Sequence, residues 1–180
     1  GLEQALELRR QLGDIAGQAG PLGNMGLVRH AQGDITGAIS AWRSGLAIAE
    51  QIGDRELVGI FFNNIGEGYF ELGEHALAKT ALTDARAIAT ETGDQRTLAD
   101  VLRNLGALAL ARGDWNRGLA AVDEAIGLCQ RMGSRLGLGQ ALRTRGEILG
   151  HQLYADSNMK GRKPSEATGC FTDALEIFED

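Results

Sequence analysis

The sequence predicts an all-α fold, a right-handed solenoid of antiparallel helix pairs. Short strings that contain glycine recur at regular intervals and divide the chain into segments of similar length. Within a segment, apolar residues recur at three- and four-residue steps, which is the pattern of an amphipathic helix. The composition includes 26 glycines but 2 prolines, and this combination favours closely packed helices over strands or disorder.

The recurring strings form two interleaved series, and the members of each series are evenly spaced. The first series is Leu-Gly-Asp, Ile-Gly-Asp, Thr-Gly-Asp and Met-Gly-Ser, at 12–14, 52–54, 92–94 and 132–134. The second series is Gln-Gly-Asp, Leu-Gly-Glu and Arg-Gly-Asp, at 32–34, 72–74 and 112–114. The glycine suits the C-terminal cap of one helix, and the Asp, Glu or Ser after it suits the N-terminus of the next.

Two consecutive segments are expected to form one repeat, in which a first helix (A) is followed by an antiparallel second helix (B). We expect A helices near residues 15–31, 55–71, 95–111 and 135–152. We expect B helices near 35–51, 75–91, 115–131 and 165–179, with a partial one at 2–11. The chain then begins with the second half of a truncated repeat, at residues 1–14. Four repeats follow it in a single solenoid domain, at 15–54, 55–94, 95–134 and 135–180. Because the chain opens on half a repeat, we expect it to be part of a longer protein.

Two stretches depart from the regular repeat. Pro21 cannot donate a backbone hydrogen bond to the carbonyl of residue 17, so the first A helix is expected to start late or to kink. The fourth repeat carries an insertion near 152–164. Within it we expect a loop at Asn158–Lys163 and the restart of a helix at Pro164, because proline suits the first turn of a helix.

Glycine also occupies the middle of the A helices, where it is a poor helix former. Gly66 follows two asparagines in the string FFNNIGEGYFELGE of residues 61–74, and glycine recurs in the same column at Gly26, Gly106 and Gly146. We interpret this column as the place where the A and B helices approach too closely for a side chain.

The residues in these columns resemble the tetratricopeptide repeat, a helix-pair repeat with a characteristic pattern of large and small residues. The second repeat carries the pattern most fully, at Phe62, Ile65, Gly66, Tyr69, Ala78, Leu82 and Ala85. The 40-residue period is similar to the long-repeat subclass of this family. The resemblance implies a superhelix whose concave groove is lined by A helices, and a role in binding proteins or peptides.

The resemblance also implies which A-helix residues face the groove. One such column holds Asn24, Asn64 and Asn104, followed by Thr144 in the fourth repeat. An asparagine side chain offers both a donor and an acceptor, so this column suits the backbone of an extended peptide. The alternative is that these asparagines connect neighbouring A helices by hydrogen bonds, without touching a ligand.

The other predicted groove residues form a wall of mixed charge. They are Asn63, Glu67, Phe70 and Glu71 in the second repeat, Asp100 and Arg103 in the third, and Arg143 and Glu147 in the fourth. The middle of this wall is acidic and the arginines follow further along. It suits a peptide or helix with basic and apolar residues better than an acidic tail.

The sequence offers no motif for catalysis or for a cofactor. It lacks a phosphate-binding GxxxxGK loop, an HExxH pair and a cysteine pair at metal-ligand spacing. Cys129 and Cys170 occupy columns held elsewhere by alanine, which predicts buried packing residues. His30, His75 and His151 lie in different columns, and His75 is expected to pack near a helix start. We therefore expect no enzyme, no cofactor and no metal.

Charge and hydropathy limit the partners. The formal net charge of −6 argues against binding of nucleic acid or of an anionic membrane. No apolar run approaches the roughly 18 residues of a membrane span. Two cysteines do not form a disulfide framework, so a cytoplasmic location is expected.

The function that the sequence favours is a non-catalytic scaffold for protein–protein interaction. It would bind a peptide or a helical segment in its concave groove, as a regulatory or signalling module of a larger protein. One alternative is a structural or self-association module, in which the truncated N-terminal end pairs two copies as a homodimer. Another is a sensor of a small ligand or signalling peptide.

Overall fold

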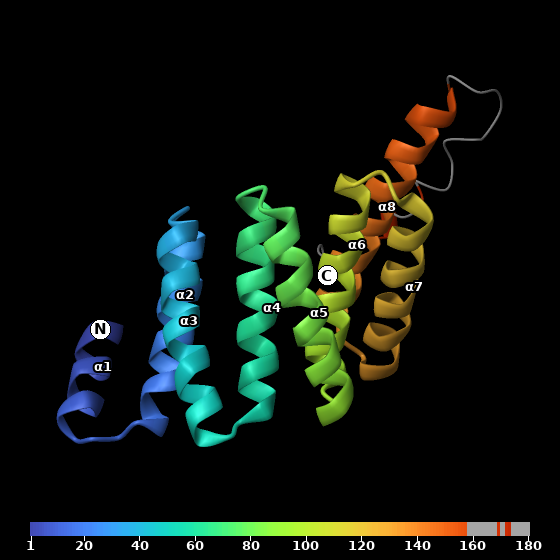
Figure 1. The fold of residues 1–180 in the computed structure, drawn as a ribbon. Coiled ribbons are helices and arrows are strands. Elements are labelled where there is room, and N and C mark those ends of the chain that lie inside the picture. Colours follow the sequence, from blue (N-terminus) through green and yellow to red (C-terminus); the bar gives the residue numbers. More distant parts are fainter. Residues whose placement is uncertain (158–168, 170–171, 174–180) are drawn as a thin grey trace. The chain divides into compact units, whose positions relative to one another are not determined.

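The computed structural model describes residues 1–157, 169 and 172–173, and the elements within them are helical (Figure 1). They are α1 (Leu2–Gln11), the short 3-10 helix η1 (Ala16–Gln18), α2 (Ala19–Ala31), α3 (Ile35–Ile52), α4 (Arg55–Glu71), α5 (His75–Thr92), α6 (Gln95–Ala111), α7 (Trp115–Met132) and α8 (Arg135–Ser157). The B helices α3, α5 and α7 begin at equal intervals, at Ile35, His75 and Trp115, which confirms the period. None of the described helices combines the length and the apolar character that a membrane span requires.

The predicted helices are confirmed between residues 35 and 111 almost to the residue, and two other helices differ. Helix α2 starts late, at Ala19, after the separate turn η1. Pro21 is then the third residue of α2, where its missing N–H removes no hydrogen bond within the helix. Helix α8 continues through Ser157, beyond the predicted end at 152. The loop that we expected after it lies outside the described residues, and so does the final B helix apart from residues 169 and 172–173, which are helical.

The turns between helices combine the glycine of each string with, at most strings, a capping side chain from the residue after it. At the end of α3, Gly53 has a φ of 72°, a left-handed conformation that glycine adopts without strain. The carboxylate of Asp54 then accepts a hydrogen bond of 3.0 Å from the backbone N–H of Leu57. Left-handed glycines recur at Gly13, Gly33, Gly73, Gly93, Gly113 and Gly133. These local signals explain why the helix boundaries were predictable.

The glycine column brings paired helices into close contact, as predicted. A β-carbon added to Gly26 would lie 2.1 Å from Nε1 of the buried Trp42. At Gly66 it would lie 2.7 Å from Cγ of Leu82, and at Gly106 it would lie 2.3 Å from Cγ2 of Val122. Packing of the large B-helix side chain against each glycine offsets the roughly 1 kcal/mol of helix propensity that glycine loses relative to alanine.

The chain divides into two compact units, Gly1–Thr97 (unit 1) and Leu98–Asp180 (unit 2). The core of unit 1 contains Ala38, Ile39, Trp42, Ala49, Val58, Phe61, Ile65, Ala81 and Ile88. The core of unit 2 contains Ala99, Leu102, Val122, Ala125, Leu128, Cys129, Ala141 and Ile148. Each unit thus buries its own apolar face, and the single continuous solenoid that we expected stays a prediction.

Candidate functional site

Four of the six predicted groove residues of unit 1, namely Asn24, Asn64, Glu67 and Glu71, lie on one face of its A helices. In α4 the residues Ile60, Asn64, Glu67 and Glu71 follow one another at three- and four-residue steps, so they share a face. In α2 the residues Gly20, Asn24, Leu27 and Ala31 occupy the equivalent positions, one repeat earlier, and all four are exposed. We call these two stripes the A-helix face of unit 1.

This face combines polar and apolar side chains. Asn24 is exposed and Asn64 is half-buried. Leu27 and Ile60 keep 53% and 37% of their surface exposed, which makes them the large apolar side chains of the face. Ile60 was not among the residues that we named from the sequence, although it occupies the same stripe as Asn64.

An ion pair connects α2 with α4 at one end of the face. Nε2 of His30 lies 2.8 Å from Oε1 of Glu71, and both side chains are partly exposed. The His30 ring also lies 5.7 Å, centroid to centroid, from the ring of Trp42. We did not predict this pair. Both residues lie in the last turns of successive A helices, but this position alone does not show that the two side chains meet.

Other predicted residues of α4 are less accessible. Asn63 is only 7% exposed, and it is not free of partners, so it is not a side chain that stands open to a ligand. Phe70 is half-buried and stacks on the ring of His75, with centroids 5.7 Å apart and planes at 23°. This contact confirms that His75 packs near the start of its helix.

In unit 2 the predicted column is buried. Asn104 is 5% exposed and has an interaction partner, and the hydroxyl of Thr144 donates a 3.2 Å hydrogen bond to the carbonyl of Gln140. The residues of the column therefore differ in accessibility: Asn24 and Asn64 are at least partly accessible, whereas Asn104 and Thr144 are buried. The Thr144 bond lies within α8 and does not connect two A helices, so both alternatives for the column stay predictions.

The charged residues predicted in unit 2 are engaged in contacts of their own. Arg143 and Glu147 form an exposed ion pair of 3.6 Å within α8, and Asp100 and Arg103 are half-buried and not free of partners. Cys129 is buried, as predicted. Its burial raises the pKa of its thiol, and the nearby Asp100 carboxylate raises it further. Cys170 lies outside the described residues.

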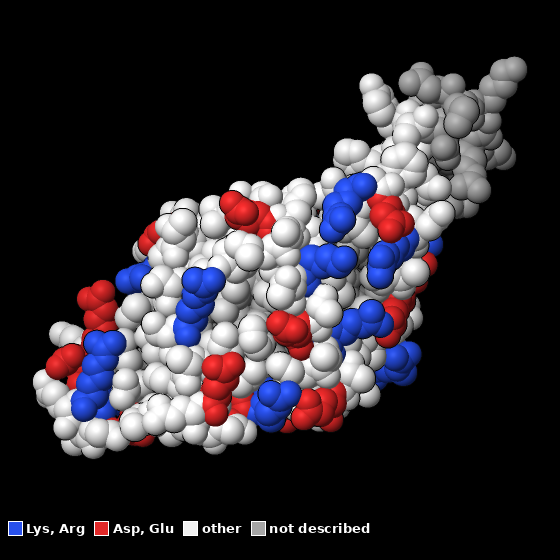
Figure 2. Space-filling view, in the orientation of Figure 1, with Lys and Arg blue, Asp and Glu red and all other residues white. Residues whose placement is uncertain are grey.

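Both units carry charges of either sign on their surface. Figure 2 shows Lys, Arg, Asp and Glu side chains scattered over a largely uncharged surface in the view drawn. Within residues 1–157, 169 and 172–173, no group of three or more His, Cys, Asp or Glu side chains could hold a metal ion. The A-helix face, which carries amide, carboxylate and apolar side chains, is the candidate site that the sequence predicted.

A comparison with protein-family models identifies the type of repeat. Residues 17–91, which include most of η1, all of α2, α3 and α4, and nearly all of α5, match a family model described as tetratricopeptide repeat. A search of curated proteins by sequence finds no significant match. The matched residues contain both stripes of the A-helix face.

Solved structures share the fold at low sequence identity. BtubC from P. vanneervenii matches with a TM-score of 0.71 and 17% identity, over 99% of this chain and 78% of that one. The TPR-like repeats assigned to a kinesin light chain of Podosopora anserina match with a TM-score of 0.67 and 13% identity, over 98% and 82% of the two chains. MamA matches with a TM-score of 0.58 and 19% identity, over 99% and 90%. These likenesses confirm the predicted all-α solenoid of helix pairs.

Proposed function

We propose that this tetratricopeptide repeat chain is a non-catalytic scaffold that binds a peptide or helical segment of a partner protein on the A-helix face of unit 1. The observation that supports this proposal most is that Asn24 is exposed and Asn64 partly exposed on the same face as Leu27 and Ile60. Such a face needs no reacting group. Recognition would depend on hydrogen bonds to the ligand backbone and on burial of apolar side chains.

The side chains of the face suit a ligand with apolar and basic residues. Each asparagine amide can donate to a backbone carbonyl and accept from a backbone N–H. Leu27 and Ile60 would each lose exposed apolar surface, which contributes about 25 cal/mol per Å² removed from water. The carboxylate of Glu71 lies 2.8 Å from Nε2 of His30 and would also attract a basic ligand side chain.

The experiment that tests this proposal is a selection of phage-displayed random peptides on the full chain, followed by binding measurements with variants. We expect the selected peptides to combine apolar and basic residues. Asn64→Ala should weaken their binding about tenfold, since each lost hydrogen bond to a buried ligand group costs on the order of 1–2 kcal/mol. Asn116→Ala, which changes an exposed asparagine of α7, is the matched control.

Two outcomes would contradict the proposal. One is equal binding by the wild type and by the Asn24→Ala/Asn64→Ala double variant. The other is a loss of helicity or a much lower melting temperature in that double variant, because the asparagines would then be structural.

Self-association is a second candidate function, favoured by apolar residues at the N-terminal end of unit 1. Leu8, Leu12 and Ile15 are exposed, and Leu12 keeps 72% of its surface accessible. Light scattering over a range of concentrations tests it. A mass that doubles with concentration in the wild type, and not in Leu8→Glu/Leu12→Glu, would support a homodimer.

A further inference from the structure

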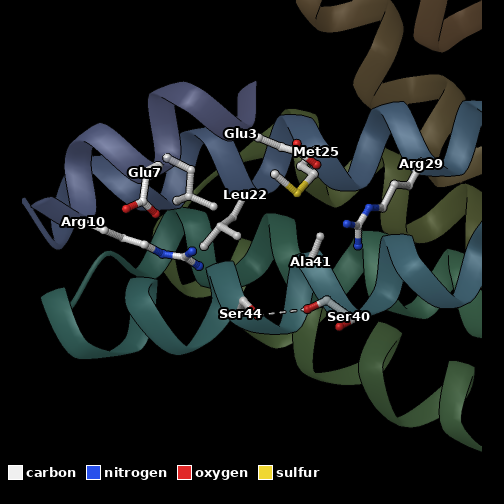
Figure 3. Close-up of a pocket in the computed structure, with 10 residues that line it drawn as sticks. Glu3, Glu7, Arg10, Leu22, Met25, Arg29, Ser40, Ala41 and Ser44 are labelled. Atoms are coloured by element: carbon white, nitrogen blue, oxygen red, sulfur yellow. Dashed lines mark hydrogen bonds between the residues drawn. The ribbon is translucent and has the colours of Figure 1, made fainter. Parts of the chain in front are cut away.

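We infer that unit 1 carries a second binding site, a cleft between α1, α2 and α3 that takes a peptide segment with an apolar side chain flanked by charged side chains of both signs. The cleft has a volume of about 460 Å³. Its lining comes from three helices (Figure 3): Glu3, Leu6, Glu7 and Arg10 of α1, Leu22, Met25 and Arg29 of α2, and Ser40, Ala41 and Ser44 of α3.

The cleft lies on a different face of α2 from the site proposed above. With about 100° between successive residues, Leu22 and Arg29 point well away from Asn24. The second site is therefore independent of the proposed function, and the two can fail separately.

The floor of the cleft is apolar. Leu6, Leu22 and Ala41 are buried, and Met25 beside them is partly exposed. A methionine side chain adapts to differently shaped apolar groups, so this floor suits one apolar side chain of a ligand. The hydroxyl of Ser44, which donates to the carbonyl of Ser40 at 3.1 Å, still has lone pairs for a ligand N–H.

Charges of both signs stand at each end of this floor. In Figure 3, Glu7 and Arg10 lie at one end, beside Leu22, and Glu3 and Arg29 lie at the other, beside Met25. Arg29 is held in place by a 3.2 Å hydrogen bond from its guanidinium to the carbonyl of Gly37. No hydrogen bond or ion pair joins the side chains of Glu3 or Arg10 to the part of the chain that the structure describes. Their charges are thus available to a ligand.

At the same place in the next repeat, a contact joins the two residues that are equivalent to Glu3 and Arg29. Arg43 is the equivalent of Glu3, one repeat later, and Tyr69 is the equivalent of Arg29. The guanidinium of Arg43 donates to the Tyr69 hydroxyl and lies over its ring, 5.6 Å from the centroid. With Glu3 and Arg29 at these positions that contact is absent, and Met25 is the partly exposed apolar side chain of the floor.

The occupant is better matched by a peptide than by a compact small molecule. A second hollow of about 490 Å³ shares Glu3, Met25 and Arg29 with the cleft and extends it past Val28 to Gln32. A ligand that follows both hollows is elongated. Mixed charges at both ends of an apolar floor then favour a segment in which acidic and basic side chains flank an apolar one.

The test uses fluorescently labelled synthetic peptides with a central leucine between lysine and glutamate residues, titrated with the full chain and followed by anisotropy. Two variants close the cleft. Ser44→Trp fills the cleft from an exposed position. Glu3→Arg/Arg29→Tyr introduces the arginine–tyrosine pair that Arg43 and Tyr69 form in the next repeat. We expect each to weaken binding at least about tenfold, whereas Asn64→Ala leaves it unchanged.

The test also compares peptides with other flanking charges and measures the molecular mass of the protein. Peptides flanked only by lysine or only by glutamate should bind several-fold more weakly. Equal binding by Ser44→Trp and the wild type, or equal binding of all three peptides, would overturn the inference. So would a doubled mass of the wild type that Ser44→Trp abolishes, because the occupant would then be a second copy of this chain.

Discussion

His30 of α2 and Glu71 of α4 form an ion pair of 2.8 Å that connects the two A helices of unit 1. Both side chains are partly exposed, so water and salt screen the pair. A double-mutant cycle with His30→Ala and Glu71→Ala should give a coupling free energy of about 0.2–1 kcal/mol at a pH where the histidine is charged. Urea unfolding measures it. The coupling should decrease with added salt, and a coupling that is unaffected by salt would contradict an electrostatic origin.

Gly26 should tolerate no side chain. The β-carbon of Gly26→Ala would meet Nε1 of Trp42 at 2.1 Å, and the ring has no space to retreat because Trp42 is buried. We expect a loss of about 1–3 kcal/mol in the free energy of unfolding, although alanine is the better helix former. Gly20→Ala in the same helix is the control, since its β-carbon would meet nothing within 4 Å. It should stabilise the protein, and equal effects of the two changes would contradict this account.

The cap of α4 gives a prediction with an internal control. Asp54 accepts a hydrogen bond from the backbone of Leu57 at 3.0 Å, so Asp54→Ala should cost about 1 kcal/mol of stability. Glu74 stands at the equivalent position of α5, but its side chain makes no capping hydrogen bond. Glu74→Ala should therefore change the free energy of unfolding by only a few tenths of a kcal/mol. Chemical denaturation of the two variants distinguishes the cap from the general effect of removing a charge.

The ion pair of Arg55 and Glu91 predicts how the stability of the protein depends on pH. Their exposed ion pair of 2.7 Å lowers the pKa of Glu91 through a hydrogen bond and charge attraction. Because the folded pKa is depressed, the stability that the pair contributes is present above the ordinary glutamate pKa and is lost as pH falls through the lowered value. An NMR titration of the Glu91 carboxyl should show the depressed pKa, and Arg55→Gln should return it towards its usual range. A titration unaffected by that change would sink this explanation.

The sequence was sufficient for features that depend on neighbouring residues. Gly53 and Asp54 end one helix and begin the next through contacts within a few residues, so the boundaries could be predicted. The packing of Gly66 against Leu82 could also be predicted, because the repeat places the same pair of columns together each time.

Features that depend on the placement of neighbouring helices could not be predicted. A column assigns Asn63 and Asn104 to a helix face, but it does not show how much of that face other side chains cover, and both are buried. The pairing of His30 with Glu71 requires the register of two helices that are not consecutive in the chain. The Arg43–Tyr69 contact has no counterpart at Glu3 and Arg29, and a periodic pattern does not reveal that difference.

The most direct test of the central claim is an NMR titration of the full chain with a peptide selected on it, following the side-chain amide signals of its asparagines. The account predicts that the signals of Asn24 and Asn64 shift with the bound fraction, while the signal of the exposed Asn116 stays in place. Shifts that spare Asn24 and Asn64 would contradict binding on the A-helix face.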